Sequence, residues 1–139
     1  MDFLSKNEKV LENEFINQGF IIREAANKDA LKKIQKFAID ILSRKGGNSL
    51  DNAHKYIGIN ELNDFRLNVI KEINAQAWLK EAYDKIAKSY LDILVGNELA
   101  MQSRINLSIQ LPKDSSSLLS VHADTWSGDS PFEVVVWLP

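Results

Sequence analysis

Residues 101–111 read MQSRINLSIQL, and apolar and polar side chains alternate along this stretch. Apart from Ser103, every odd position is apolar, and every even position is polar. A period of two is typical of a β-strand that buries one face, whereas a helix repeats about every 3.6 residues. Pro112 ends the pattern. The stretch therefore predicts a strand in the last third of the chain.

Two more strand-like runs follow it. Residues 118–121 are LLSV, and residues 132–138, FEVVVWL, are nearly continuously apolar. An uninterrupted apolar run of this length is expected of a strand covered on both faces. Loops rich in serine, glycine and proline separate the runs. The sequence thus predicts three or four strands, fewer than the roughly eight that a jelly roll needs.

Upstream of these runs the apolar residues recur with helical spacing. Gly19 and Gly96 are placed to end helices, and Asn27 and Asn60 are placed to begin them. The predicted helices cover residues 8–18, 27–44, 60–73 and 79–94, with a polar loop over residues 48–60. We therefore expect one domain over residues 1–139, mainly helical over residues 1–98 and stranded over residues 99–139.

The composition is that of an ordinary globular protein, with 139 residues, 45% of them hydrophobic and 26% charged. The net charge of −2 gives no reason to expect binding to nucleic acid or to an anionic membrane. The absence of cysteine excludes disulfides, thiolate metal sites and cysteine nucleophiles. No segment reaches membrane-spanning length and no signal-peptide core is seen, so a cytoplasmic location is expected.

The triplet His122-Ala123-Asp124 lies between two of the predicted strands. A neutral imidazole nitrogen and a carboxylate oxygen are two of the three ligands in the facial triad of non-haem Fe(II) oxygenases. Taken alone, a His-x-Asp triplet is a weak motif, and a loop histidine beside a turn-capping aspartate is the ordinary reading. Its setting favours a metal site, because a strand and the loop TWSGDSP flank the triplet.

The segments LSIQLP (107–112), SVHADTWSG (120–128) and FEVVVWLP (132–139) resemble Fe(II)/2-oxoglutarate-dependent oxygenases of the phytanoyl-CoA-dioxygenase-like group. They are most similar to the bacterial oxygenases of carbohydrate and surface-polysaccharide biosynthesis. The resemblance is most specific over residues 102–139. It implies an α+β fold, with N-terminal helices packed on a partial double-stranded β-helix of the jelly-roll or cupin type. It also implies a hydroxylase of a small-molecule substrate that uses Fe(II), with 2-oxoglutarate as co-substrate.

Residue by residue, the resemblance implies that His122 and Asp124 are the first two iron ligands. It assigns the 2-oxoglutarate pocket to Trp137 and to the polar face of the first strand, where a solvated sheet face is an equal alternative. That polar face consists of Asn106, Ser108 and Gln110. Arg104 and Trp126 are expected on the substrate side, and a packing role is an alternative for both.

The family's second histidine and its 2-oxoglutarate arginine have no counterpart by position in this sequence. His54, the other histidine, falls in the predicted polar loop and is expected to be an ordinary loop residue. The barrel is therefore expected to be incomplete, as in a truncated chain or the N-terminal part of a longer oxygenase. An incomplete barrel exposes a strand edge at residues 132–138, which predicts self-association or low stability.

Two other functions fit the same residues. A cupin-like, metal-dependent sugar isomerase or epimerase could use a histidine and a carboxylate without 2-oxoglutarate. A non-catalytic binding domain, in which His122 is incidental, would explain why a third ligand is missing.

Overall fold

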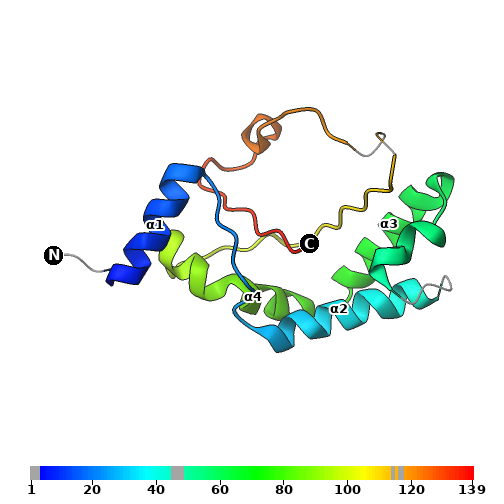
Figure 1. The fold of residues 1–139 in the computed structure, drawn as a ribbon, viewed down its shortest axis with the longest axis horizontal. Coiled ribbons are helices and arrows are strands. Elements are labelled where there is room, and N and C mark those ends of the chain that lie inside the picture. The colour runs from blue at the N-terminus through cyan, green and yellow to red at the C-terminus, as the bar shows by residue number, and fades with distance from the viewer. Residues whose placement is uncertain (1–3, 45–48, 114, 116–117) are drawn as a thin grey trace. The chain divides into compact units, whose positions relative to one another are not determined.

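In the part of the chain that the computed structural model describes, the regular structure consists of four α-helices and two short 3-10 helices (Figure 1). The structure describes residues 4–44, 49–113, 115 and 118–139. The elements, in chain order, are α1 (Lys6–Gln18), α2 (Lys28–Ser43), η1 (Leu50–Lys55), α3 (Ile59–Asn74), α4 (Leu79–Leu94) and η2 (Asp124–Ser127).

The expected α+β fold with a partial jelly-roll barrel is wrong for the described residues, which contain helices and no strand. Each of the three predicted strands is an extended or irregular segment without a sheet partner. Alternation along a sequence fixes which side chains share a face, but a strand also needs a second backbone to satisfy its N–H and C=O groups. That second condition is not encoded in the period of the sequence.

The helix termini follow from local capping. The Ser5 side chain accepts from the Glu8 backbone N–H, and the Glu8 carboxylate accepts from the Ser5 N–H, which together form a capping box that begins α1. Gly19 ends α1 in the left-handed conformation, with φ of 77°. Asn27 caps α2 by accepting from the Ala30 N–H at 2.9 Å, as predicted.

The region before α3 differs from its prediction. Residues 48–60 were expected to form a loop, yet η1 lies within them. The predicted cap at Asn60 is also wrong, because α3 begins one residue earlier and Gly58 is its N-cap. Gly58 has an extended backbone and supplies no side-chain cap. A glycine N-cap makes no side-chain hydrogen bond, so the type of side chain at position 58 does not indicate the start of α3.

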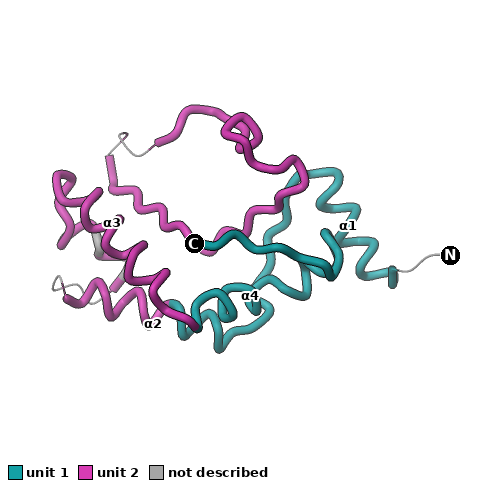
Figure 2. Tube along the Cα trace, turned by 180° about the vertical axis from the view of Figure 1, so that it is seen from behind, with its two compact units in different colours: residues 1–34, 78–103 teal, residues 35–77, 104–139 magenta. Residues whose placement is uncertain are grey.

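The chain divides into two compact units, shown in teal and magenta in Figure 2. Unit 1 consists of residues 1–34 and 78–103, and unit 2 consists of residues 35–77 and 104–139. The boundary falls inside α2, so the first half of that helix belongs to unit 1 and the second half to unit 2.

In unit 1, α1 packs on α4. The buried residues of unit 1 are small or branched and come from three helices: Leu11, Ala30, Leu79, Ala82, Ile86 and Ala87.

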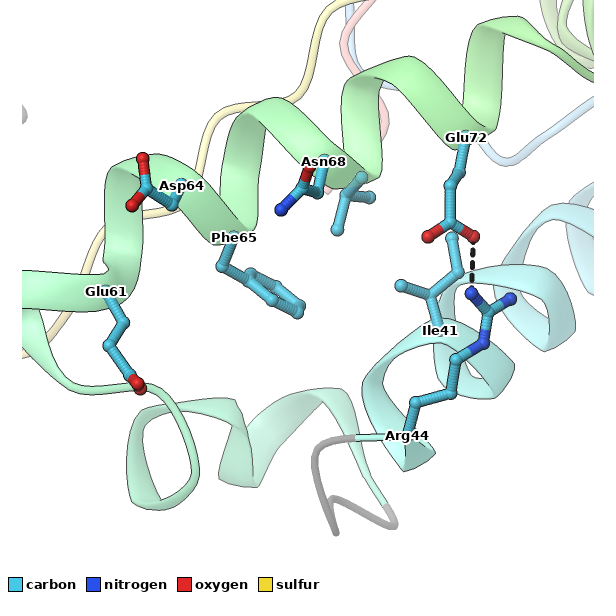
Figure 3. Close-up of a pocket in the computed structure, with 8 residues that line it drawn as sticks. Ile41, Arg44, Glu61, Asp64, Phe65, Asn68 and Glu72 are labelled. Atoms are coloured by element: carbon cyan, nitrogen blue, oxygen red, sulfur yellow. Dashed lines mark hydrogen bonds and ion pairs between the residues drawn. The ribbon is translucent and has the colours of Figure 1, made fainter.

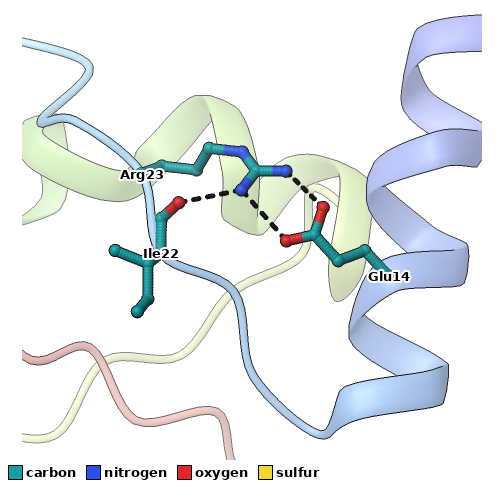
Figure 4. A network of polar contacts seen from close by, with 3 residues as sticks. All are labelled: Glu14, Ile22 and Arg23. Carbon is teal, nitrogen blue, oxygen red and sulfur yellow. Dashed lines mark hydrogen bonds and ion pairs between the residues drawn. The ribbon is translucent and has the colours of Figure 1, made fainter.

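Polar contacts hold the extended segment that follows α1. Arg23 makes a bidentate pair with Glu14 at 2.6 and 3.0 Å and also donates to the carbonyl of Ile22 (Figure 4). Tyr90 on α4 donates its hydroxyl to the carbonyl of Glu24 at 3.1 Å.

In unit 2, the segment that was predicted as the first strand packs on helices. Leu111 belongs to a buried cluster with Leu42, Ile57 and Leu62, and Ile109 and Phe65 pack against that cluster. Helices α2 and α3 therefore cover the apolar face of residues 105–111. Within residues 105–111 the alternation separates the buried and half-buried side chains from the exposed ones, whereas Met101 on the same predicted face is 43% exposed. The surface that covers residues 105–111 is helical.

Asn74, the last residue of α3, anchors the start of this segment. Its side-chain oxygen accepts from the Ile105 N–H at 2.8 Å, and its amide nitrogen donates to the Ile105 carbonyl at 2.9 Å. The same amide group also donates to the carbonyl of Ile70 at 2.7 Å. A single side chain therefore satisfies both backbone groups of Ile105, as a neighbouring strand would do in a sheet.

Candidate metal site

His122 and Asp124 bring their side chains together in unit 2. The distance from His122 Nε2 to Asp124 Oδ1 is 3.4 Å. This is longer than the roughly 2.7–2.9 Å of a charge-assisted hydrogen bond between two such groups. The two side chains are 42% and 57% exposed, so solvent reaches the space between the two atoms.

A backbone contact orients the His122 ring. Nδ1 lies 2.7 Å from the carbonyl oxygen of Ser120, two residues earlier in the chain. A carbonyl oxygen only accepts, so Nδ1 carries the proton in this contact. In the neutral ring Nε2 is then left with its lone pair on the side of Asp124. Histidines that bind metals commonly have this arrangement, with the second ring nitrogen donating to a carbonyl or carboxylate.

The turn after the motif fixes the aspartate. Asp124 is the first residue of η2, and Ala123 is its N-cap. The Trp126 N–H donates to the Ala123 carbonyl at 2.9 Å. Gly128 closes the turn in the left-handed conformation with φ of 99°, a value that favours glycine. The turn therefore holds the Asp124 backbone, and its carboxylate remains directed at His122.

The spacing of the two ligand atoms fits a shared cation. Two atoms each about 2.1 Å from one metal ion lie about 3.0 Å apart at a right angle and about 3.4 Å apart at a tetrahedral angle. The observed 3.4 Å falls within that range. Among the described residues, however, no group of three or more histidine or acidic side chains is placed to hold an ion. The site built from these residues therefore supplies two protein ligands.

The other residues predicted for the site are exposed. Along the extended segment they are Arg104, Asn106, Ser108 and Gln110, all on the polar side of the alternation. Trp126 in η2 is 77% exposed and Trp137 is 75% exposed. His54 lies in η1, outside the motif, and is also exposed. In the described part of the chain, none of them shares a hydrogen bond or an ion pair with the side chain of His122 or Asp124.

A groove that the sequence did not indicate lies between α2 and α3 in unit 2 (Figure 3). Its volume is about 330 Å³, and Ile41, Phe65 and Val69 provide its apolar lining. An ion pair of 2.6 Å between Arg44 and Glu72 lies at one end of the groove. The sequence predicts a helix over residues 60–73 from the helical spacing of its apolar residues. The sequence alone does not distinguish a stripe that is fully covered from one that lines a groove.

Comparisons with protein-family models, with curated proteins and with solved structures found no match to this chain. None of the helices in the described ranges has both the length and the apolar character needed to cross a bilayer.

Proposed function

We propose that this chain contributes to an Fe(II)/2-oxoglutarate-dependent oxygenase of a small metabolite, with His122 and Asp124 as two of its iron ligands. The observation that carries the proposal is the 3.4 Å approach of Nε2 to Oδ1, with Nδ1 engaged by the Ser120 carbonyl. The proposal rests on this local geometry and on the resemblance of residues 102–139, and it does not depend on a barrel.

The role of each residue follows from its contacts. His122 offers a neutral nitrogen, Asp124 offers an anionic oxygen, and the Ser120 carbonyl holds the imidazole in the tautomer that leaves Nε2 available. Iron and 2-oxoglutarate, when bound, would supply the oxidation of an unactivated C–H bond by oxygen. The exposure of both side chains leaves room for a co-substrate beside the two ligands.

The substrate class is proposed from the resemblance alone. We propose a small carbohydrate-related metabolite, as in the bacterial oxygenases that the motif resembles. Arg104 is a residue to test on the substrate side, because it is exposed and its guanidinium can bind two oxygens at once.

The first test is a co-substrate test under anaerobic conditions. The melting temperature of the chain is measured with Fe(II) alone, with 2-oxoglutarate alone and with both. We expect the two together to raise the melting temperature more than the sum of the separate effects, because the keto acid chelates the bound ion. Stabilisation by metal with no further effect of 2-oxoglutarate would instead favour a metal-dependent isomerase.

Matched variants assign the effect to the motif. His122→Ala and Asp124→Ala are expected to abolish the joint stabilisation, whereas His54→Ala and Asp129→Ala, which change the same residue types outside the pair, are expected to retain it. Stabilisation that survives in His122→Ala would contradict the assignment. The absence of any metal effect in the unchanged chain would favour a non-catalytic binding domain.

A further inference from the structure

Large apolar side chains are exposed along residues 118–139. Seven of them fall between residues 118 and 137, with exposed fractions from 50% to 98%. They are Leu118, Leu119, Val121, Trp126, Phe132, Val135 and Trp137. Large apolar side chains that remain exposed are candidates for an interaction surface when they lie on one segment.

Residues 132–138 have the alternating exposure of a β-strand. Val134, Val136 and Leu138 are half-buried, and the residues between them are exposed, so exposure alternates with a period of two. Within the described part of the chain, Val135 and Trp137 make no hydrogen bond. Backbone N–H and C=O groups in such a segment are a template for another extended chain.

We propose that two copies of this chain associate by antiparallel pairing of residues 132–138, with Val135 facing its own copy on the twofold axis. This inference is independent of the proposed function. The segment is rich in β-branched and aromatic residues, contains one charge and lacks proline and glycine, which are the features of sequences that pair with identical copies. A second copy is therefore the partner that this segment itself specifies.

The register follows from the charge and the apolar ends. Pairing about Val135 places Phe132 opposite Leu138 of the second copy and Glu133 opposite Trp137, so the two glutamates do not face each other. Apolar residues face apolar residues at the other positions. A parallel pairing in register would place Glu133 opposite its copy, which is unfavourable for like charges.

The hydrogen-bonding groups of Val135 and Trp137 point to the same edge, since alternate residues of a strand share an edge. Pairing at this edge uses the backbone N–H and C=O of Val135. It also uses the backbone N–H of Trp137, which donates to the carbonyl of Glu133 in the second copy. It does not require the backbone groups of residues 134 and 136. The Glu133 N–H already donates to the Ser130 carbonyl at 3.0 Å, so the hydrogen bonds between the two copies end at Glu133.

The proposed interface is small. Phe132 and Trp137, 85% and 75% exposed, are the largest side chains available to it. Aromatic side chains bury about 150–250 Å² each, so the four in the dimer contribute about 600–1,000 Å², below the roughly 1,200 Å² at the lower end of stable interfaces. We therefore expect a dimer in reversible equilibrium with monomer, with a dimer fraction that rises with concentration.

Cysteine cross-linking tests the register, because the chain has no native cysteine. Val135→Cys is treated with diamide beside Val10→Cys, a control on α1 that is also exposed. We expect disulfide-linked dimers from Val135→Cys at a rate at least tenfold above the control, since opposed Cα atoms about 5.5 Å apart suit a disulfide. Equal rates would reflect random collision and would overturn the proposal.

A mixing experiment distinguishes the antiparallel from the parallel arrangement. Phe132→Cys and Leu138→Cys are mixed in equal amounts and oxidised, and the products are separated by mass. Antiparallel pairing predicts that the mixed disulfide exceeds both homodimers. Predominance of the two homodimers would overturn the proposed register.

A charge on the axis tests the association without a cross-link. Val135→Lys places two ammonium groups opposite each other and is expected to give monomer in sedimentation at concentrations where Val135→Thr still dimerises. Circular dichroism at each concentration verifies that both variants retain the helices. A Val135→Lys chain that remains dimeric, or an unchanged chain that is monomeric at millimolar concentration, would overturn the proposal.

Discussion

Asn74 shows how one side chain can take the place of a sheet partner. It bonds both backbone groups of Ile105, which is itself buried, so its loss would leave an N–H and a C=O without partners in the core. We expect Asn74→Ala to lower the free energy of unfolding by about 1–3 kcal/mol, measured by urea denaturation.

The control for this change is Asn63→Ala on the same helix, where the asparagine oxygen accepts from Arg66 in an exposed hydrogen bond. Both changes replace asparagine by alanine in α3, and only Asn74 contacts Ile105, so the larger loss is expected at Asn74. Equal stability of the two variants would show that the Asn74 contacts do not hold residues 104–111 in place.

At the scale of a single element, two half-buried carboxylates hold the contacts of α1. The side chain of Ser5 lowers the pKa of Glu8, and the guanidinium of Arg23 lowers the pKa of Glu14 (Figure 4). A carboxylate with a lowered pKa in the folded state stabilises that state above its ordinary pKa of 4.5, and this stabilisation is lost as the pH falls through the lowered value. The contacts of α1 are therefore expected to weaken in acid.

Glu14→Gln tests this expectation, because glutamine keeps the shape but does not titrate. Unfolding is followed at pH 7 and at pH 3. We expect the variant to be less stable than the unchanged chain at pH 7 and to lose less stability on acidification, with Glu12→Gln on the same helix as the control. A Glu14→Gln variant with an unchanged pH dependence would contradict the role of the Glu14–Arg23 pair.

At the scale of the whole molecule, unit 2 has a core shared by helices and an extended segment. Leu42, 2% exposed, lies in the same cluster as Leu111. Leu42→Ala is expected to cost about 2–5 kcal/mol and to raise amide exchange in both α3 and residues 105–111. Leu67→Ala, at a position on α3 that is 53% exposed, is expected to leave both regions protected.

The sequence predicted the four α-helices because each carries a helical apolar stripe and most have a local stop or start signal. It also predicted the buried side of residues 105–111, because Ile105 and Leu111 share one face. It did not predict what covers that face, since Asn74 and the helical cluster are distant in sequence. For the candidate site, the triplet indicated His122 and Asp124, but the contact of the ring with Ser120 depends on backbone geometry that a motif does not contain.

The most direct test of the account is a calorimetric titration of Co²⁺, an oxygen-stable substitute for Fe(II), into the unchanged chain, His122→Ala, Asp124→Ala and the double variant. If both side chains bind one ion, each single change lowers the affinity at least tenfold and the double change adds little more, because ligands of one ion are coupled. His54→Ala should bind as the unchanged chain does. Affinities that are unaltered in both single variants would contradict the shared metal site.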